Sequence, residues 1–128
     1  GTLKTYIAGS ETSSGSAGSA IHSGGSGTLH MMAQGNTSTW PTYGYIADTR
    51  LVIGTAVYSG NFSVPNGPLT KTGGSYSSTT NVNTSINAAH TYLLTNQTKS
   101  GTTIADNSDQ NFTMVTAGSL TGSSTVPY

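Results

Sequence analysis

Small uncharged polar residues dominate this chain and restrict the folds open to it. Of its 128 residues, 19 are serine, 23 are threonine and 17 are glycine, while 33% are hydrophobic and only 6% are charged. Threonine is β-branched and fits the pleated surface of a sheet, whereas serine and glycine favour turns. The composition therefore predicts one all-β module with a thin core, because small chains bury the least of their surface.

The few charges exclude several classes of function. The four cations (Lys4, Arg50, Lys71 and Lys99) are scattered along the chain, and the formal net charge is zero. Binding of nucleic acid or of an anionic lipid surface needs clustered cations. The sequence also lacks an apolar run long enough to span a membrane. We therefore expect no nucleic-acid partner and no membrane insertion, and zero net charge favours association of copies.

Short β-type segments alternate with turn residues. The strongest predicted strand is Tyr45 to Ile53, followed by a kink at Gly54. A helical turn is predicted within Ser85 to Leu94, leading into a strand at Tyr92 to Thr95. The run Gly9 to Gly27 is nearly all Gly, Ser, Ala and Thr and is predicted as a flexible loop. Further strands are predicted at Leu3 to Ala8, Thr28 to Met32, Asn111 to Thr116 and Thr125 to Tyr128.

Two segments resemble a known family. Residues 44–70 contain an Arg-aliphatic pair at Arg50, the letters TAVY ending at Tyr58, and an Asn-Phe-Ser-x-Pro turn ending at Pro65. Residues 92–119 contain two leucines, then Asp-Asn-Ser, then Asn-Phe-Thr. These features are similar to concanavalin A-like (laminin-G-like) domains of marine phage virion structural proteins. The family match implies an antiparallel β-sandwich of the jelly-roll type.

The order of the matched segments bears on domain organisation. Strands that close the family's domain come first here, and strands that open it come last. Residues 1–128 are therefore predicted to be a single sandwich module or a fragment of a larger repeat protein. Alternatively, a neighbouring chain supplies the strands that complete the sandwich, which would cover edges that a half-sandwich exposes.

Two groups of residues are candidate binding sites. Trp40, Tyr43, Tyr45 and Tyr58 would line a carbohydrate-binding face, because aromatic rings stack on sugars, and the alternative for them is core or interface packing. The second group, Asp106 and Asp109, provides oxygen ligands for calcium. The alternative for this pair is an Asx-turn that enters the next strand. No other cofactor is expected.

The resemblance implies a virion structural protein rather than an enzyme. No paired carboxylates, nucleophile elbow or cysteine suggest catalysis. The expected role is a fibre, collar or capsid-decoration module on the virus particle, with copies of itself, other virion proteins and host surface glycans as partners. The alternative is a secreted subunit of an extracellular filament, or a lectin-like carbohydrate-binding module at a cell surface. The fold alone does not choose between these functions.

Overall fold

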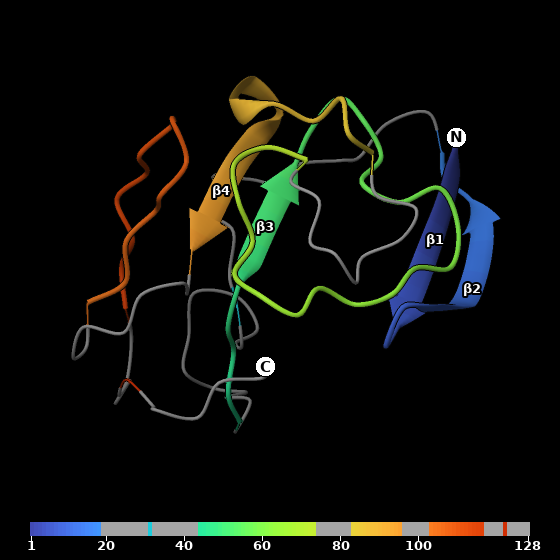
Figure 1. Cartoon of the computed structure of the whole chain (residues 1–128), viewed down its shortest axis with the longest axis horizontal. Helices are drawn as coiled ribbons and strands as arrows, with labels where there is room; N and C mark the ends of the chain where they lie inside the picture. The colour runs from blue at the N-terminus through green and yellow to red at the C-terminus, as the bar shows by residue number, and fades with distance from the viewer. Residues whose placement is uncertain (19–30, 32–43, 74–82, 96–102, 117–121, 123–128) are drawn as a thin grey trace.

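The described part of the chain is all-β and consists of two small antiparallel sheets. The computed structural model describes residues 1–18, 31, 44–73, 83–95, 103–116 and 122. One sheet pairs β1 (Thr2–Ile7) with β2 (Ser10–Ser16), and the other pairs β3 (Thr49–Val52) with β4 (Thr91–Thr95) (Figure 1). A single 3-10 turn, η1 (Ala88–His90), precedes β4. Across the described ranges, no helix has the length and apolar character needed to cross a membrane.

Strands β1 and β2 form a tight hairpin. The two residues of its loop, Ala8 and Gly9, have φ angles of 50° and 81°, as the type I′ turn favoured in hairpins requires. Gly9 is needed because a Cβ there would collide with the carbonyl oxygen of Phe62, whose N–H donates to the Gly9 carbonyl at 2.9 Å. The flexible loop predicted for Gly9 to Gly27 is therefore wrong over residues 10–16, which pair with β1, and residues 19–27 lie outside the described residues.

The two faces of the hairpin have different surroundings. Leu3 and Ile7, which period two places on one face, are 65% and 70% exposed. From the opposite face, Tyr6 packs edge-on against Phe62, with ring centroids 5.5 Å apart. The hairpin thus attaches to the body of the protein through Tyr6, and its aliphatic face contributes nothing to the core.

The hydroxyl of Tyr6 gives a direct test of this packing. Its oxygen is buried and has no hydrogen-bond partner among the described residues, and an unsatisfied buried polar group destabilises a fold by roughly 1–3 kcal/mol. We therefore expect Tyr6→Phe, which keeps the ring, to leave stability unchanged or raise it by about 1 kcal/mol. Tyr6→Ala should lower stability because it removes the ring contact. Thermal unfolding measures both, and a clear loss of stability in Tyr6→Phe would contradict the packing described.

The core lies around β4. The buried apolar side chains of the described residues are Ile86, Leu93 and Leu94, exposed by 2%, 5% and 3%. Burial of each contributes roughly 1.5–3 kcal/mol. Thr91 and Thr95, on the same strand, are fully buried, and their hydroxyls donate to the carbonyls of residues 71 and 105 at 2.7 and 2.9 Å. Strand β4 is therefore the centre of this small fold.

The turn into β4 confirms the prediction for this segment. Asn87 caps η1: its side chain accepts a hydrogen bond from the N–H of Ala89 at 3.0 Å. In return, His90 Nδ1 accepts from the N–H of Asn87 at 3.2 Å. This reciprocal capping satisfies two backbone donors that the short helix leaves free. The helical spacing thus extends over one turn, after which threonine and tyrosine start the strand.

Two other predicted strands differ from the structure. Tyr45 to Ile53 is extended as a strand only over Thr49–Val52, because Asp48 just before it has a left-handed φ of 48°. The kink predicted at Gly54 is confirmed by its φ of 92°. Residues 111–116 form no strand, and Asn111 has a φ of 49°. The strand predicted at Thr125 to Tyr128 lies outside the described residues, as does nearly all of the one at Thr28 to Met32.

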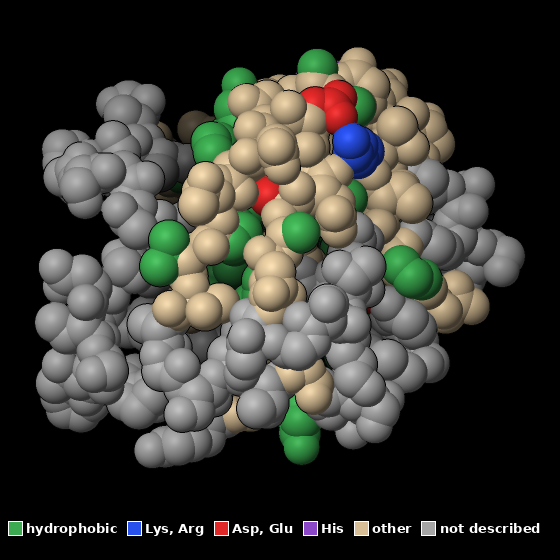
Figure 2. Space-filling view, turned by 90° about the vertical axis from the view of Figure 1, so that its left-hand side faces the viewer, with side chains coloured by type: hydrophobic (Ala, Val, Ile, Leu, Met, Phe, Trp, Pro, Cys, Tyr) green, Lys and Arg blue, Asp and Glu red, His purple; other side chains and the backbone are tan. Residues whose placement is uncertain are grey.

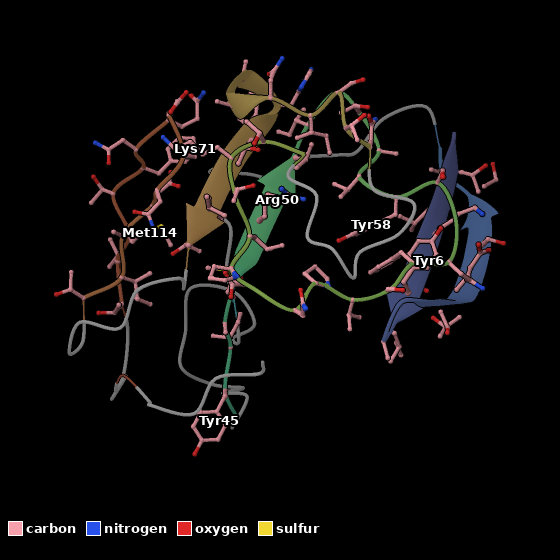
Figure 3. The ribbon with its side chains drawn as sticks, in the orientation of Figure 1. Tyr6, Tyr45, Arg50, Tyr58, Lys71 and Met114 are labelled. Atoms are coloured by element: carbon pink, nitrogen blue, oxygen red, sulfur yellow. The ribbon has the colours of Figure 1, made fainter. Side chains whose placement is uncertain are left out.

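Side chains hold an irregular segment beside the β3–β4 sheet. Arg50, on β3, donates from Nη1 to the carbonyls of Thr70 and Thr72 at 2.8 and 3.2 Å (Figure 3). The hydroxyl of Thr91 on β4 donates to the carbonyl between them, that of Lys71. Arg50 therefore has a structural role, and the loop it holds takes the place of a further strand on this sheet.

Candidate functional site

The aromatic residues predicted to bind carbohydrate do not form one platform in the described structure. Tyr45 is 79% exposed, and Figure 3 places it far from Tyr58. Tyr58 stacks face to face on Phe62, with ring centroids 3.6 Å apart and 5° between the planes. Trp40 and Tyr43 lie outside the described residues. Tyr45 and Tyr58 thus do not share a sugar-binding face. Tyr58 instead packs within the fold, which was the alternative prediction for these aromatic residues.

Burial also affects the phenol of Tyr58. Desolvation raises the pKa of Tyr58, and the positive charge of Arg50 offsets part of this effect. Its ring belongs to a cluster with Phe62 and Tyr6 that joins the hairpin to the rest of the chain. The sequence signal for this cluster was Phe62, the aromatic residue in the Asn-Phe-Ser turn, which was interpreted only as part of the family resemblance.

Asp106 is the centre of the densest polar network in the described residues. It is 5% exposed, and its Oδ1 accepts from the N–H of Leu94 at 3.0 Å and from that of Ser108 at 2.9 Å. Its Oδ2 accepts from the Ser108 hydroxyl and from the N–H of Phe112, both at 2.9 Å. One carboxylate therefore ties β4 to two points of the segment that follows it.

This network stabilises the ionised form of Asp106. Burial by itself raises the pKa of Asp106, but the N–H groups of Ser108, Leu94 and Phe112 together with the Ser108 hydroxyl outweigh it, so the pKa lies below its usual value. A carboxylate that accepts several backbone N–H bonds is expected to behave in this way. Asp106 is therefore an anion that the fold itself satisfies.

The calcium site predicted at Asp106 and Asp109 is not formed. Asp109 is exposed and pairs with Lys71, with 2.6 Å between its Oδ1 and Nζ. Both oxygens of Asp106 already accept from protein donors, whereas calcium takes six to eight oxygens with their lone pairs directed at the ion. Within the described ranges, no group of three or more His, Cys, Asp or Glu could hold a metal. The Asx-turn at Asp106 to Ser108, the alternative for this segment, is the arrangement present.

The surface with the features of a binding site is the β1–β2 hairpin. Both strands belong to a two-stranded sheet, and every residue of β2 is exposed. Its one ion pair joins Lys4 to Glu11 at 2.7 Å, and a surface pair of this kind contributes at most about 1 kcal/mol. Glu11 lies in the run Gly9 to Gly27 that was predicted to be flexible, and no local sequence pattern indicated its pairing with Lys4. The hairpin can supply main-chain hydrogen bonds and an aliphatic face.

Charged groups are sparse on the rest of the visible surface. Figure 2 looks onto the side that includes residues 103–116, where most of the described surface is uncharged and a basic group lies beside an acidic one. Ten large apolar residues of the described part are exposed, against three that are buried. They are Leu3, Ile7, Tyr45, Ile46, Leu51, Ile53, Val64, Tyr92, Phe112 and Val115. Such a surface suits contact with other protein surfaces rather than with ionic ligands.

Comparison with known proteins gives no relative from which function could be transferred. No family model, no curated protein and no solved structure matches the chain.

Proposed function

We propose that this chain is a structural protein of a virus particle, a fibre, collar or capsid-decoration module that works by assembly and not by catalysis. The observation that supports this most is the imbalance of burial: three apolar side chains form the core of the described residues while ten large ones are exposed. Exposed apolar surface of this extent is typical of a chain that packs against neighbours.

The sheets support the same proposal. A two-stranded hairpin alone is marginally stable in water, and open strand edges invite pairing with another chain. The described part has two such sheets. We propose that copies of the chain, and other virion proteins, complete them into the laminin-G-like jelly-roll sandwich that the sequence resembles. With a formal net charge of zero, copies do not repel one another.

Attachment to host glycans is a second part of this proposal. Tyr45 supports it by its exposure of 79%, since an open aromatic ring can stack on a sugar. Tyr58, stacked on Phe62, is assigned to packing. A glycan-binding face would then be built around Tyr45 in the assembled particle rather than around the four aromatic residues together.

The isolated chain tests the assembly proposal. We expect light scattering to give an oligomer of two or more copies at micromolar concentration, because association would bury the exposed apolar side chains. A glycan array on the same sample tests attachment, with Tyr45→Ala as the variant expected to lose any signal. A folded monomer at all concentrations would contradict assembly, and a monomer that binds one defined glycan would favour a lectin-like module.

A secreted filament subunit remains the second candidate function, and glycosylation at one residue would distinguish it from the first. Asn111 begins an Asn-Phe-Thr sequon, is exposed, and makes no side-chain hydrogen bond to any described residue. Asn61 and Asn83 also begin sequons, but their amides bond to Glu11 N and to Thr55. A glycan found on Asn111 in the native protein would favour the filament, because glycosylation of sequons marks secreted proteins.

A further inference from the structure

The backbone of β2 has hydrogen-bonding groups that point away from its partner strand. The pair Gly1–Ala17 is hydrogen-bonded, since Ala17 N donates to the Gly1 carbonyl at 2.9 Å. Bonded and non-bonded pairs alternate along an antiparallel ladder, and the register is unbroken from this end to Thr5. The N–H and C=O groups of Ser16 and Ser14 therefore face outward from the hairpin.

This outward edge has no partner strand within the described part of the chain. Strand β2 lies at the rim of the molecule, on the side of β1 away from the β3–β4 sheet (Figure 1). All seven of its residues are exposed. Asn61 accepts from the N–H of Glu11 at 2.9 Å and so occupies the edge at its start. Neither Ser14 nor Ser16 bonds to any described residue beyond the hairpin. The free edge thus runs from Ser13 to Ser16.

None of the usual protections of a strand edge is present there. Natural edges are blocked by lysine, proline or a bulge, but residues 13–16 are Ser, Ser, Gly and Ser, and the bulge lies before them, at the step between Thr5 and Tyr6. The edge of β1 differs because it carries Lys4, the residue type with which natural strand edges discourage pairing. Charge therefore selects β2 over β1 for pairing with an identical chain.

Gly15 adds an independent observation. Its φ is not in the left-handed region, and a Cβ built on it would meet nothing within 4 Å. Nothing in the described part of the chain therefore requires glycine in the middle of this strand, where it weakens the sheet. Glycine in a strand interior often marks the close approach of another backbone.

We propose that β2 pairs antiparallel with β2 of a second copy of this chain, in the register centred on Gly15. Ser14 of each copy then exchanges main-chain hydrogen bonds with Ser16 of the other, and the two Gly15 residues face each other as a non-hydrogen-bonded pair. The result is a four-stranded sheet, β1–β2–β2–β1, about a two-fold axis. This inference rests on the proposed assembly function and assigns it a specific contact.

The small, uncharged side chains of this edge suit a second copy. In this register each Glu11 lies beyond the paired residues and is neutralised by Lys4 of its own chain at 2.7 Å. No like charges meet across the new pair, and serine faces serine. The assembled sheet also places the exposed Leu3 side chains of both copies on one face, in line with the glycine pair.

A disulfide reports this register directly. Non-hydrogen-bonded pairs have Cα atoms about 4.5 Å apart, within the range a disulfide bridges. We expect Gly15→Cys to form a covalent dimer when oxidised with diamide, as seen on a non-reducing gel. Gly18→Cys is the matched control, because its site is equally open. In the proposed register, however, the two introduced cysteines are offset by six residues along the strands, roughly 20 Å. It should give less than a tenth of the dimer.

A proline variant tests the same edge without a cysteine. Ser14→Pro removes an N–H that faces the second copy and leaves the bonds within the hairpin intact. We expect it to weaken the dimer at least tenfold in sedimentation, while Ser14→Ala should leave it unchanged. If the wild-type chain forms oligomers but neither Gly15→Cys nor Ser14→Pro behaves as stated, the edge assignment is wrong and assembly stands. A monomeric wild type without a selective cross-link would overturn both proposals.

Discussion

Replacing Asp106 by alanine is expected to destabilise the protein by about 3–5 kcal/mol, among the largest effects of any single substitution outside the hydrophobic core. The substitution removes four hydrogen bonds, at 2.9 to 3.0 Å, from a carboxylate that is 5% exposed. It leaves the N–H groups of Leu94 and Phe112 without their partner. Chemical unfolding followed by circular dichroism measures the change.

Asp109 provides the matched control for this experiment. It lies three residues further along, but its carboxylate is exposed and, among the described residues, pairs with Lys71 alone. Exposed ion pairs contribute little, so Asp109→Ala should change stability by less than about 1 kcal/mol. Equal effects of the two alanine variants would contradict the central role of Asp106 and would favour a site in which both carboxylates act together, as in the calcium prediction.

The pH dependence of stability follows from the same network. Because the folded pKa of Asp106 is lowered, its ionised form stabilises the fold fully above the unfolded value of about 3.9. That contribution is lost as the pH falls through the folded pKa. We expect the wild-type protein to lose stability below about pH 4 more steeply than Asp106→Asn, which has no proton to bind there. Parallel curves for the two proteins would contradict this assignment.

Replacing Leu94 by alanine is expected to destabilise the protein by about 2–5 kcal/mol. Leu94 is 3% exposed and shares the core with Ile86 and Leu93. In so small a core, the cavity left by the missing atoms has few neighbours that can move in to fill it. Urea unfolding measures the loss, and a reduced m-value would indicate that the native state has loosened as well.

Leu51 is the control for the core substitution. It lies on β3 of the same sheet, opposite Leu93 in the register, but is 42% exposed. Leu51→Ala should cost about 1 kcal/mol or less, because much of its side chain already contacts solvent. If Leu51→Ala were as damaging as Leu94→Ala, the side chain of Leu51, exposed in the single chain, would instead be covered, for example by a second copy.

The sequence by itself determined the features that depend on neighbouring residues. The abundance of threonine, a β-branched residue, indicated the all-β character. The glycine after a β-branched run predicted the kink at Gly54, and the helical spacing before Tyr92 predicted one turn and then a strand. Each of these follows from local backbone preference, which acts over a few residues and does not depend on contacts with the rest of the chain.

The tertiary structure alone decided which polar and apolar residues are used, and how. Asp106 is buried and hydrogen-bonded because the N–H of Leu94 on β4, 12 residues earlier in the sequence, donates to it. The same carboxylate accepts from the N–H of Phe112, which is therefore not available for the strand predicted there. Ser10–Ser16 became a strand because β1 supplied its ladder, although its own residues favour turns. Contacts between distant segments satisfy groups that local sequence leaves open, and these contacts outweigh the small differences in local preference.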